Sequence, residues 1–126
     1  MDATQLELAC FSIIAGAGTA KSNFIQAIEE ARQGNYAEAE SLIAAGEQQL
    51  IEAHAPHTEM VQQEAAGNHI PTNILLIHAE DQMASTETFK IMAEQLIQVY
   101  HERDELKAQV AALTGATDAG AEEASC

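Results

Sequence analysis

The sequence predicts an all-α protein, an antiparallel up-down-up three-helix bundle in a single domain. Its 126 residues suit one domain. Only two prolines and seven glycines interrupt a chain rich in alanine, glutamate, glutamine and leucine, which are good helix formers. Two Gly-Asn pairs, at residues 34–35 and 67–68, divide the chain into three long segments, because glycine is typical of a helix end. Such short connections make neighbouring helices antiparallel.

The first helix is predicted from about Thr4 to Gln33. Apolar or small residues recur there at alternating spacings of three and four, which forms a heptad-like stripe over several turns. The stripe consists of Leu6, Cys10, Ile13, Ala17, Ala20, Phe24, Ala27 and Ala31. Gly16 and Gly18 weaken helix formation near the middle, so they mark either a break or a close approach of another helix.

The second helix is predicted from about Tyr36 to Ala66, with Asn35 as its capping residue. Gly46 lies on the apolar stripe, where a small residue allows close packing. Pro56 lies inside the pattern and removes a backbone donor, so we expect a kink one turn earlier. The stripe consists of Tyr36, Ala39, Ile43, Gly46, Leu50, Ala53, His57 and Met60.

The third helix is predicted from about Thr72 or Asn73 to beyond His101. A stripe with spacings of three and four continues through Phe89, Met92, Leu96 and Val99. Further apolar residues lie on more than one side of this helix, more than one bundle can bury, so the sequence predicts assembly into an oligomer. The residues concerned are Ile74, Leu75, Ile77, Ile91, Met92, Leu96 and Ile97.

The chain after Leu113 lacks large apolar residues, so residues 114–126 are predicted to form a disordered acidic tail behind a helical domain of residues 1–113. Cys126 ends that tail. Cys10 lies on the first apolar stripe, where a thiol behaves as a small buried hydrophobic group. These two cysteines alone indicate neither a disulfide framework nor a zinc site.

The formal net charge of −15 excludes nucleic acid and anionic membrane surfaces as partners, since both demand basic patches. It is compatible with a basic protein partner. We expect no membrane insertion, because no apolar run approaches about 18 residues. No basic-then-apolar leader opens the chain, so a cytoplasmic location is expected.

The segment that points most directly to chemistry is residues 74–81, Ile-Leu-Leu-Ile-His-Ala-Glu-Asp. In a helix each residue turns about 100°, so His78 and Asp81 share a face while Glu80 points away. The apolar run predicts that this face is buried, and an imidazole beside a carboxylate there is a candidate for catalysis. The alternative is a core histidine held by a nearby carboxylate.

Other candidate residues carry weaker patterns. His54 and His57 are three apart on a helix, which permits a metal pair without specifying a third ligand. We expect His69 to be solvated in a turn and His101 to lie near a helix end. Ser85 lacks the Gly-x-Ser-x-Gly context of a nucleophile, and acidic residues are too abundant for any carboxylate pair to be diagnostic.

Several strings, in order and at matching intervals, resemble the lactose/cellobiose-type enzyme IIA of the bacterial sugar phosphotransferase system. The resemblance covers roughly residues 10–105, most of the helical part of the chain. The strings are Gln-Gly-Asn-Tyr-Ala-Glu-Ala at 33–39, Glu-Ala-His at 52–54, Thr-Glu at 58–59, Gln-Glu-Ala-Ala-Gly at 63–67 and Leu-Leu-Ile-His-Ala-Glu-Asp-Gln-Met at 75–83.

The resemblance implies a homotrimer of three-helix bundles with a phosphocarrier domain at residues 1–113. His78 then accepts a phosphoryl group from the carrier HPr and passes it to the cysteine of a cognate enzyme IIB during sugar uptake. Asp81 gathers with its two symmetry mates around one divalent cation, taken as Mg²⁺. The chemistry agrees, since neutral imidazole is a good nucleophile and hard cations prefer carboxylate oxygens.

The sequence departs from the family pattern at several positions. The family commonly has His-Ala-Gln-Asp-His, whereas residues 78–82 read His-Ala-Glu-Asp-Gln. Glu80 would repel a phosphoryl group, while Gln82 keeps a hydrogen-bond donor in place of a second imidazole; both are candidate supporting residues. His57 stands where glutamine is usual, and Pro56 is unexpected. The alternative function is therefore a non-catalytic trimeric scaffold or regulatory relative that has lost efficient transfer.

Overall fold

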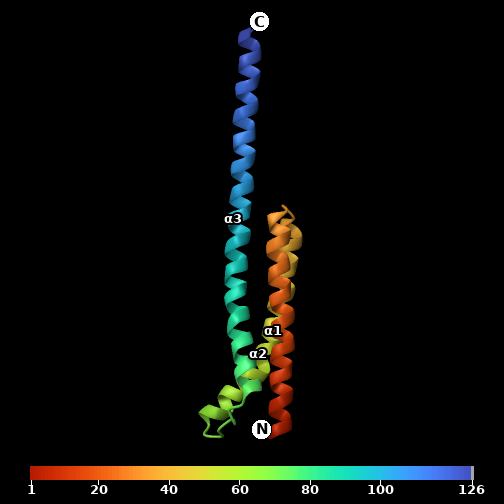
Figure 1. The fold of residues 1–126 in the computed structure, drawn as a ribbon, viewed down its shortest axis with the longest axis vertical. Helices are drawn as coiled ribbons and strands as arrows, with labels where there is room; N and C mark the ends of the chain where they lie inside the picture. Colours follow the sequence, from red (N-terminus) through yellow and green to blue (C-terminus); the bar gives the residue numbers. More distant parts are fainter. Residues whose placement is uncertain (126) are drawn as a thin grey trace.

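The protein folds as three antiparallel helices, α1 (Ala3–Arg32), α2 (Tyr36–Ala65) and α3 (Ile74–Ser125). The computed structural model describes the backbone of residues 1–125 and the side chains of residues 1–115. No strand occurs among residues 1–125, so the predicted all-α up-down-up bundle is confirmed. Figure 1 shows α3 lying beside the α1–α2 hairpin and extending far past the turn between those two helices.

The helix ends follow from local sequence. The Asp2 side chain accepts a hydrogen bond of 2.8 Å from the Gln5 backbone amide, and the Gln5 side chain accepts one from the Asp2 amide, which is a capping box. Asn73 caps α3 by accepting a 2.9 Å hydrogen bond from the Leu76 amide. Gly34 and Gly67 follow α1 and α2 with φ of +88° and +86°, a backbone conformation that favours glycine.

The capping prediction for Asn35 is confirmed in its position but not in a side-chain hydrogen bond. Asn35 occupies the N-cap position of α2, but its side chain makes no capping hydrogen bond. The Asn35 side-chain amide instead donates to the Glu30 carboxylate at 2.8 Å. Because the Asn35 side chain binds Glu30 near the end of α1, the first turn of α2 has no side-chain cap.

The core forms along α1, which packs against both α2 and α3, while α2 and α3 touch each other much less. All eight residues of the stripe predicted for α1 are buried. On α2, Ala39, Gly46, Leu50, Ala53 and Met60 are buried, and the other predicted members, Tyr36, Ile43 and His57, are half-buried. The helix most central to the bundle is thus the one with the longest regular stripe.

The core face of α3 differs from the predicted stripe. Its fully buried residues are Ala79, Met83, Thr86 and Ala93, whereas Met92 and Val99 are 52% and 55% exposed. Small side chains let α3 approach α1 closely, and the Thr86 hydroxyl donates to the Ala17 carbonyl at 3.1 Å. Of the predicted stripe, Phe89 packs against the core, whereas Met92 and Val99 lie on the opposite side of α3, which also carries large apolar residues.

Two glycines permit close contact between helices. A Cβ on Gly16 would lie 3.1 Å from the Ala53 Cβ, so Gly16 marks a close approach of α2 and not a break. A Cβ on Gly46 would lie 2.5 Å from the ring of Phe24, which is fully buried. The predicted close packing at Gly46 is therefore confirmed.

Replacing Gly46 tests this contact. We expect Gly46→Ala to lower the free energy of unfolding by about 1–2 kcal/mol, because overpacking outweighs the gain in helix propensity. Gly18→Ala is the matched control, since nothing lies within 4 Å of its added Cβ, and it should stabilise the protein by up to about 1 kcal/mol. Urea denaturation measures both changes, and equal stabilisation by the two substitutions would contradict the packing.

The end of α3 also differs from the sequence prediction. The backbone is helical through Ser125, where a disordered acidic tail was predicted for residues 114–126. Alanine and glutamate favour helix, and no proline follows Leu113 to stop it. The absence of large apolar residues thus removes packing partners without removing helix propensity. Cys126 lies outside the described residues.

α2 and α1 each have one further feature. α2 continues through Pro56 as one helix, and its last turns lean away from α1 in Figure 1. Within the described chain, α1 alone is long and apolar enough to cross a membrane by length and composition, with mean hydropathy 1.2. Core helices of soluble proteins pass the same test, and the apolar stripe of α1 is already buried in the bundle.

Candidate functional site

His78 and Asp81 lie in the first two turns of α3, on the side that faces away from α1 and α2. They share a face, as their spacing predicts, but in the single chain this face is exposed and not buried. The apolar residues that lead into His78 divide between two sides of the helix. Leu75 and Leu76 pack on the bundle core, whereas Ile74 and Ile77 are 80% and 54% exposed.

His78 differs from the four other histidines in having no carboxylate partner. His54 pairs with Glu87 at 2.8 Å, His57 with Glu80 at 3.0 Å, His69 with Glu64 at 2.8 Å, and His101 with Glu105 at 3.3 Å. The described residues offer His78 no hydrogen bond or ion pair. Its ring nitrogens are therefore free to react, which excludes the alternative of a core histidine held by an acid.

Glu80 points away from His78, as predicted, and its carboxylate contacts α2. The Glu80 carboxylate lies 3.0 Å from the His57 Nε2. Two positions that depart from the family pattern are thus in contact, and this contact directs the Glu80 carboxylate toward α2 and away from His78. Gln82, one turn beyond His78, is half-buried, and no hydrogen bond in the described chain occupies its amide.

The site holds no preformed metal cage within one chain. No group of three or more His, Cys, Asp or Glu side chains that could bind a metal occurs among the described residues. Asp81 is exposed and forms no ion pair or hydrogen bond with the described part of the chain. Cys10 is fully buried, and burial, followed by the charge of Glu80, raises the pKa of its thiol. It is an inert core residue, as predicted.

Several polar pairs link α2 to α3, and sequence reasoning missed them. Besides the two histidine pairs, the Lys90 ammonium lies 2.6 Å from the Glu47 carboxylate, and this hydrogen bond raises the pKa of Lys90. The Tyr36 hydroxyl donates to the Asp104 carboxylate at the far end of the bundle. Histidines of α2 opposite acids of α3, and Lys90 of α3 opposite Glu47 of α2, were the available signal.

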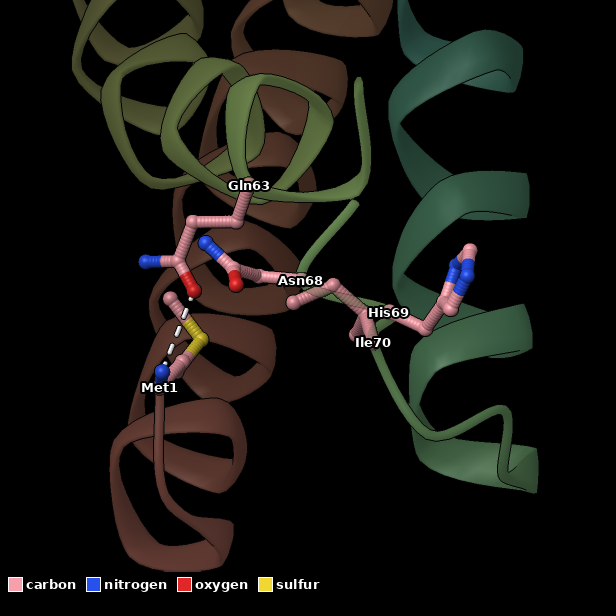
Figure 2. A pocket seen from close by; sticks show the side chains of 5 residues that line it. All are labelled: Met1, Gln63, Asn68, His69 and Ile70. Carbon is pink, nitrogen blue, oxygen red and sulfur yellow. Dashed lines mark hydrogen bonds between the residues drawn. The ribbon is translucent and has the colours of Figure 1, made fainter. Parts of the chain in front are cut away.

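A separate cavity of about 570 Å³ lies at the end of the bundle where the chain begins. It is lined by Met1, Gln63, Asn68, His69 and Ile70, and the Met1 amino group donates to the Gln63 side chain at 3.1 Å. Figure 2 shows the His69 ring turned away from Met1 and Gln63. His69 is highly exposed, as predicted. Neither His78 nor Asp81 lines this cavity.

Comparison with known proteins identifies the family. A family model described as "PTS system, Lactose/Cellobiose specific IIA subunit" matches residues 8–101, which include His78, Asp81 and nearly all of the bundle core. The chain belongs to this enzyme IIA family. Its role is accordingly that of a phosphocarrier in a sugar phosphotransferase system.

Individual relatives agree with this enzyme IIA assignment. The lactose-specific EIIA component of Lactococcus lactis subsp. lactis is 32% identical over 100 residues, covering 79% of this chain and 95% of the relative. The crystal structure of the cellobiose-specific enzyme IIA from Bacillus anthracis matches with a TM-score of 0.79 and 33% identity, over 83% of this chain and 95% of that one.

A third match shows the shared fold at lower identity. It is a solution structure of the IIA(Chitobiose)–HPr complex from Escherichia coli, with a TM-score of 0.69 and 23% identity. The match covers 79% of this chain and 96% of that chain. In the present chain the last helix continues from residue 102 to Ser125, beyond the span of the family model.

Tyr36 and Asp104 form a hydrogen bond where the α1–α2 turn meets α3. Burial and then the hydrogen bond to Asp104 raise the pKa of Tyr36 to about 12, and the same hydrogen bond lowers the pKa of Asp104. The hydrogen bond therefore stabilises the folded protein through the ionised form of Asp104. Because the pKa of Asp104 falls below its ordinary value of 3.8, this contribution to the free energy of unfolding is fully present above pH 3.8. It is lost as the pH falls through the lowered pKa.

We therefore expect Tyr36→Phe to lower the melting temperature at about pH 7, and the difference from wild type to shrink at about pH 3. Tyr100→Phe is the matched control, because the Tyr100 hydroxyl makes no hydrogen bond to the described residues, and its ring keeps its contact with Arg103. Thermal unfolding followed by circular dichroism measures the effect. An unchanged melting temperature for Tyr36→Phe at about pH 7 would refute it.

Proposed function

We propose that His78 of this enzyme IIA accepts a phosphoryl group from HPr and passes it to the cysteine of a cognate enzyme IIB during sugar uptake, in the cytoplasm. The observation that carries the proposal is that His78 alone among the five histidines has an exposed side chain free of any carboxylate. HPr is the named partner of a solved enzyme IIA with this fold.

The transfer follows from the chemistry of imidazole. A neutral ring nitrogen of His78 attacks the phosphorus of phospho-HPr, and a P–N bond forms as the bond from phosphorus to the donor breaks. The second transfer follows when the thiolate of enzyme IIB attacks the same phosphorus. An S–P bond forms as the P–N bond to His78 breaks. Positioning and charge stabilisation dominate such transfers. The Gln82 amide, one turn away, supports them by donating to a phosphoryl oxygen.

We further propose that the enzyme IIA assembles as a homotrimer with its α3 helices innermost. The exposed side of α3 carries Ile74, Ile77, Met92 and Val99, and apolar area on this scale favours association. Asp81 lies on the same side, so three carboxylates meet at the trimer axis. Exposed, unpartnered carboxylates suit a hard, oxygen-ligated cation, and Mg²⁺ is the proposed ion. When bound, it neutralises charge that the three chains bring together.

Phosphoryl transfer in a purified system tests the proposal. The protein is incubated with HPr, the kinase that phosphorylates HPr, and phosphoenolpyruvate, and its intact mass is then measured. We expect the mass of one phosphoryl group to be added per chain. A mass that stays unchanged while HPr is phosphorylated would contradict the proposal.

The second candidate is a non-catalytic trimeric scaffold of the same family. Gln82 favours it, because a second imidazole beside the nucleophile is replaced by an amide. The contact between His57 and Glu80 weighs against it, since the altered charge is paired on α2. The same mass measurement separates the two functions, because a scaffold remains unmodified.

A further inference from the structure

The charge of the chain opposes the transfer proposed above. Its formal net charge is −15, and a phosphoryl group carries about two negative charges at pH 7, so the field of the whole chain repels the group that His78 receives. The Glu80 carboxylate is directed toward His57, but the carboxylate of Asp81 is exposed beside the acceptor. A positive charge held on the His78 side of the bundle would offset this repulsion.

Lys21 of α1 supplies a positive charge on that side. Its ammonium donates to the Ser85 hydroxyl of α3 at 3.0 Å and lies 4.9 Å from the centre of the Phe89 ring. Both of these partners are neutral. No carboxylate of the described residues pairs with Lys21, so its charge is not neutralised within the bundle.

The four other basic residues of the chain each act on a carboxylate. Three of them form ion pairs, which are Arg32 with Glu29 at 3.6 Å, Lys90 with Glu47 at 2.6 Å and Arg103 with Asp104 at 2.9 Å. Lys107 helps to lower the pKa of Asp104, after the hydrogen bond from Tyr36 and the contacts of Arg103. In a chain with 20 acidic and only five basic residues, the unpaired state of Lys21 sets it apart.

A row of polar side chains on α3 leads from His78 to Lys21. His78, Gln82 and Ser85 follow one another at spacings of four and three, which places them along one side of the helix. At 1.5 Å per residue, Ser85 lies about 10 Å along α3 from His78. This separation is close to the Debye length of about 8 Å at physiological salt. The Lys21 ammonium therefore acts on an anion at His78 through its electric field and not by contact.

We propose that Lys21 is a positioning residue that draws the phosphoryl group of phospho-HPr to the His78 side of the bundle. Ser85 and Phe89 hold its ammonium against α3, so the charge stays on this side instead of moving with a free lysine side chain. Lys21 acts on the encounter, before the P–N bond forms. The inference rests on the proposed transfer from HPr to His78 and adds to it a residue of α1.

Removing the charge while keeping the apolar stem tests this role. Lys21→Met keeps a long, flexible side chain beside the Phe89 ring and removes the ammonium. Lys107→Met is the matched control, because it changes the net charge equally at a residue about 40 Å along α3 from His78. Lys21→Arg keeps the charge and is the conservative variant.

The measurement is the second-order rate constant for transfer from phospho-HPr to the full chain, followed by rapid quenching and intact mass. It is made at about 0.01 M and about 1 M salt, where the Debye lengths are about 30 Å and about 3 Å. At low salt we expect Lys21→Met to react about 5–10-fold more slowly than Lys107→Met, because electrostatic guidance raises association rates. At high salt the two variants should agree within about twofold, since screening removes the guidance.

Lys21→Arg should react within about twofold of the wild type at both salt concentrations, because the charge is retained. Equal rates for the two methionine variants at low salt would overturn the inference. A deficit of Lys21→Met that persists at high salt would also overturn it, because a lysine that only holds α1 to α3 acts independently of salt.

The same experiment separates this inference from the proposed function. A wild type that acquires no phosphoryl group while HPr is phosphorylated refutes the transfer itself, and guidance by Lys21 with it. A phosphorylated wild type whose Lys21→Met variant matches Lys107→Met refutes only the guidance. Circular dichroism reports the folding of each variant. If Lys21→Met loses helix content, Lys21→Gln takes its place, since glutamine also removes the charge and favours helix.

Discussion

His78→Ala enzyme IIA should acquire no phosphoryl group from phospho-HPr under conditions in which the wild type becomes fully modified. The substitution removes the attacking nitrogen, so transfer is abolished and not merely slowed. Folding should be unaffected, because the His78 side chain is exposed and makes no hydrogen bond within the described structure. Intact-mass measurement reports the modification, and far-ultraviolet circular dichroism reports the helix content.

The matched control is His101→Ala, which removes another exposed histidine of α3. His101 pairs with Glu105 at 3.3 Å, and its loss should leave phosphorylation at the wild-type level. The bond to a histidine nitrogen is labile in acid and stable in alkali, so acid treatment should release the added mass. Equal modification of the wild type and His78→Ala would show that another residue is the acceptor.

The buried face of α1 was predictable to the residue, whereas that of α3 was not. Every member of the stripe predicted for α1 is buried, because α1 contacts both other helices and has one regular apolar side. α3 has two candidate sides. Of its four buried residues, three, Ala79, Thr86 and Ala93, carry little apolar signal in a sequence, and only Met83 is large and apolar. The large residues Met92 and Val99 carry more signal and lie on the other side.

The adjacency of His78 and Asp81 was predictable because it depends only on helical spacing. The lack of a carboxylate partner for the His78 imidazole was not predictable, because it depends on which residues the acids of α3 contact. Glu80 and Glu87 are satisfied by His57 and His54 of α2, contacts that require the packing of two helices. The exposure of the site face follows from that packing as well, since it leaves the face that was predicted to be buried open to solvent.

Asp81→Leu should give a trimer at least as stable as the wild type and indifferent to chelators. Three carboxylates on one axis repel each other, and at a separation of about 5 Å with an effective dielectric constant of about 20 each pair costs about 3 kcal/mol. In the proposed trimer, a bound divalent cation would offset this repulsion in the wild type. Leucine removes the charge and extends the apolar face, and such replacements of interior charges are often neutral or stabilising.

The wild type should therefore lose thermal stability when a chelator is added at neutral pH, by several degrees or more for an effect of a few kcal/mol. Sedimentation equilibrium should show about three chains of 13.5 kDa for both proteins when metal is present. Asp2→Asn is a control for general charge effects, because Asp2 caps α1 and accepts its hydrogen bond from Gln5 within the chain. That variant should respond to the chelator as the wild type does. If the chelator leaves the wild-type melting temperature unchanged and elemental analysis finds no metal, Asp81 binds no cation and the three chains meet without one.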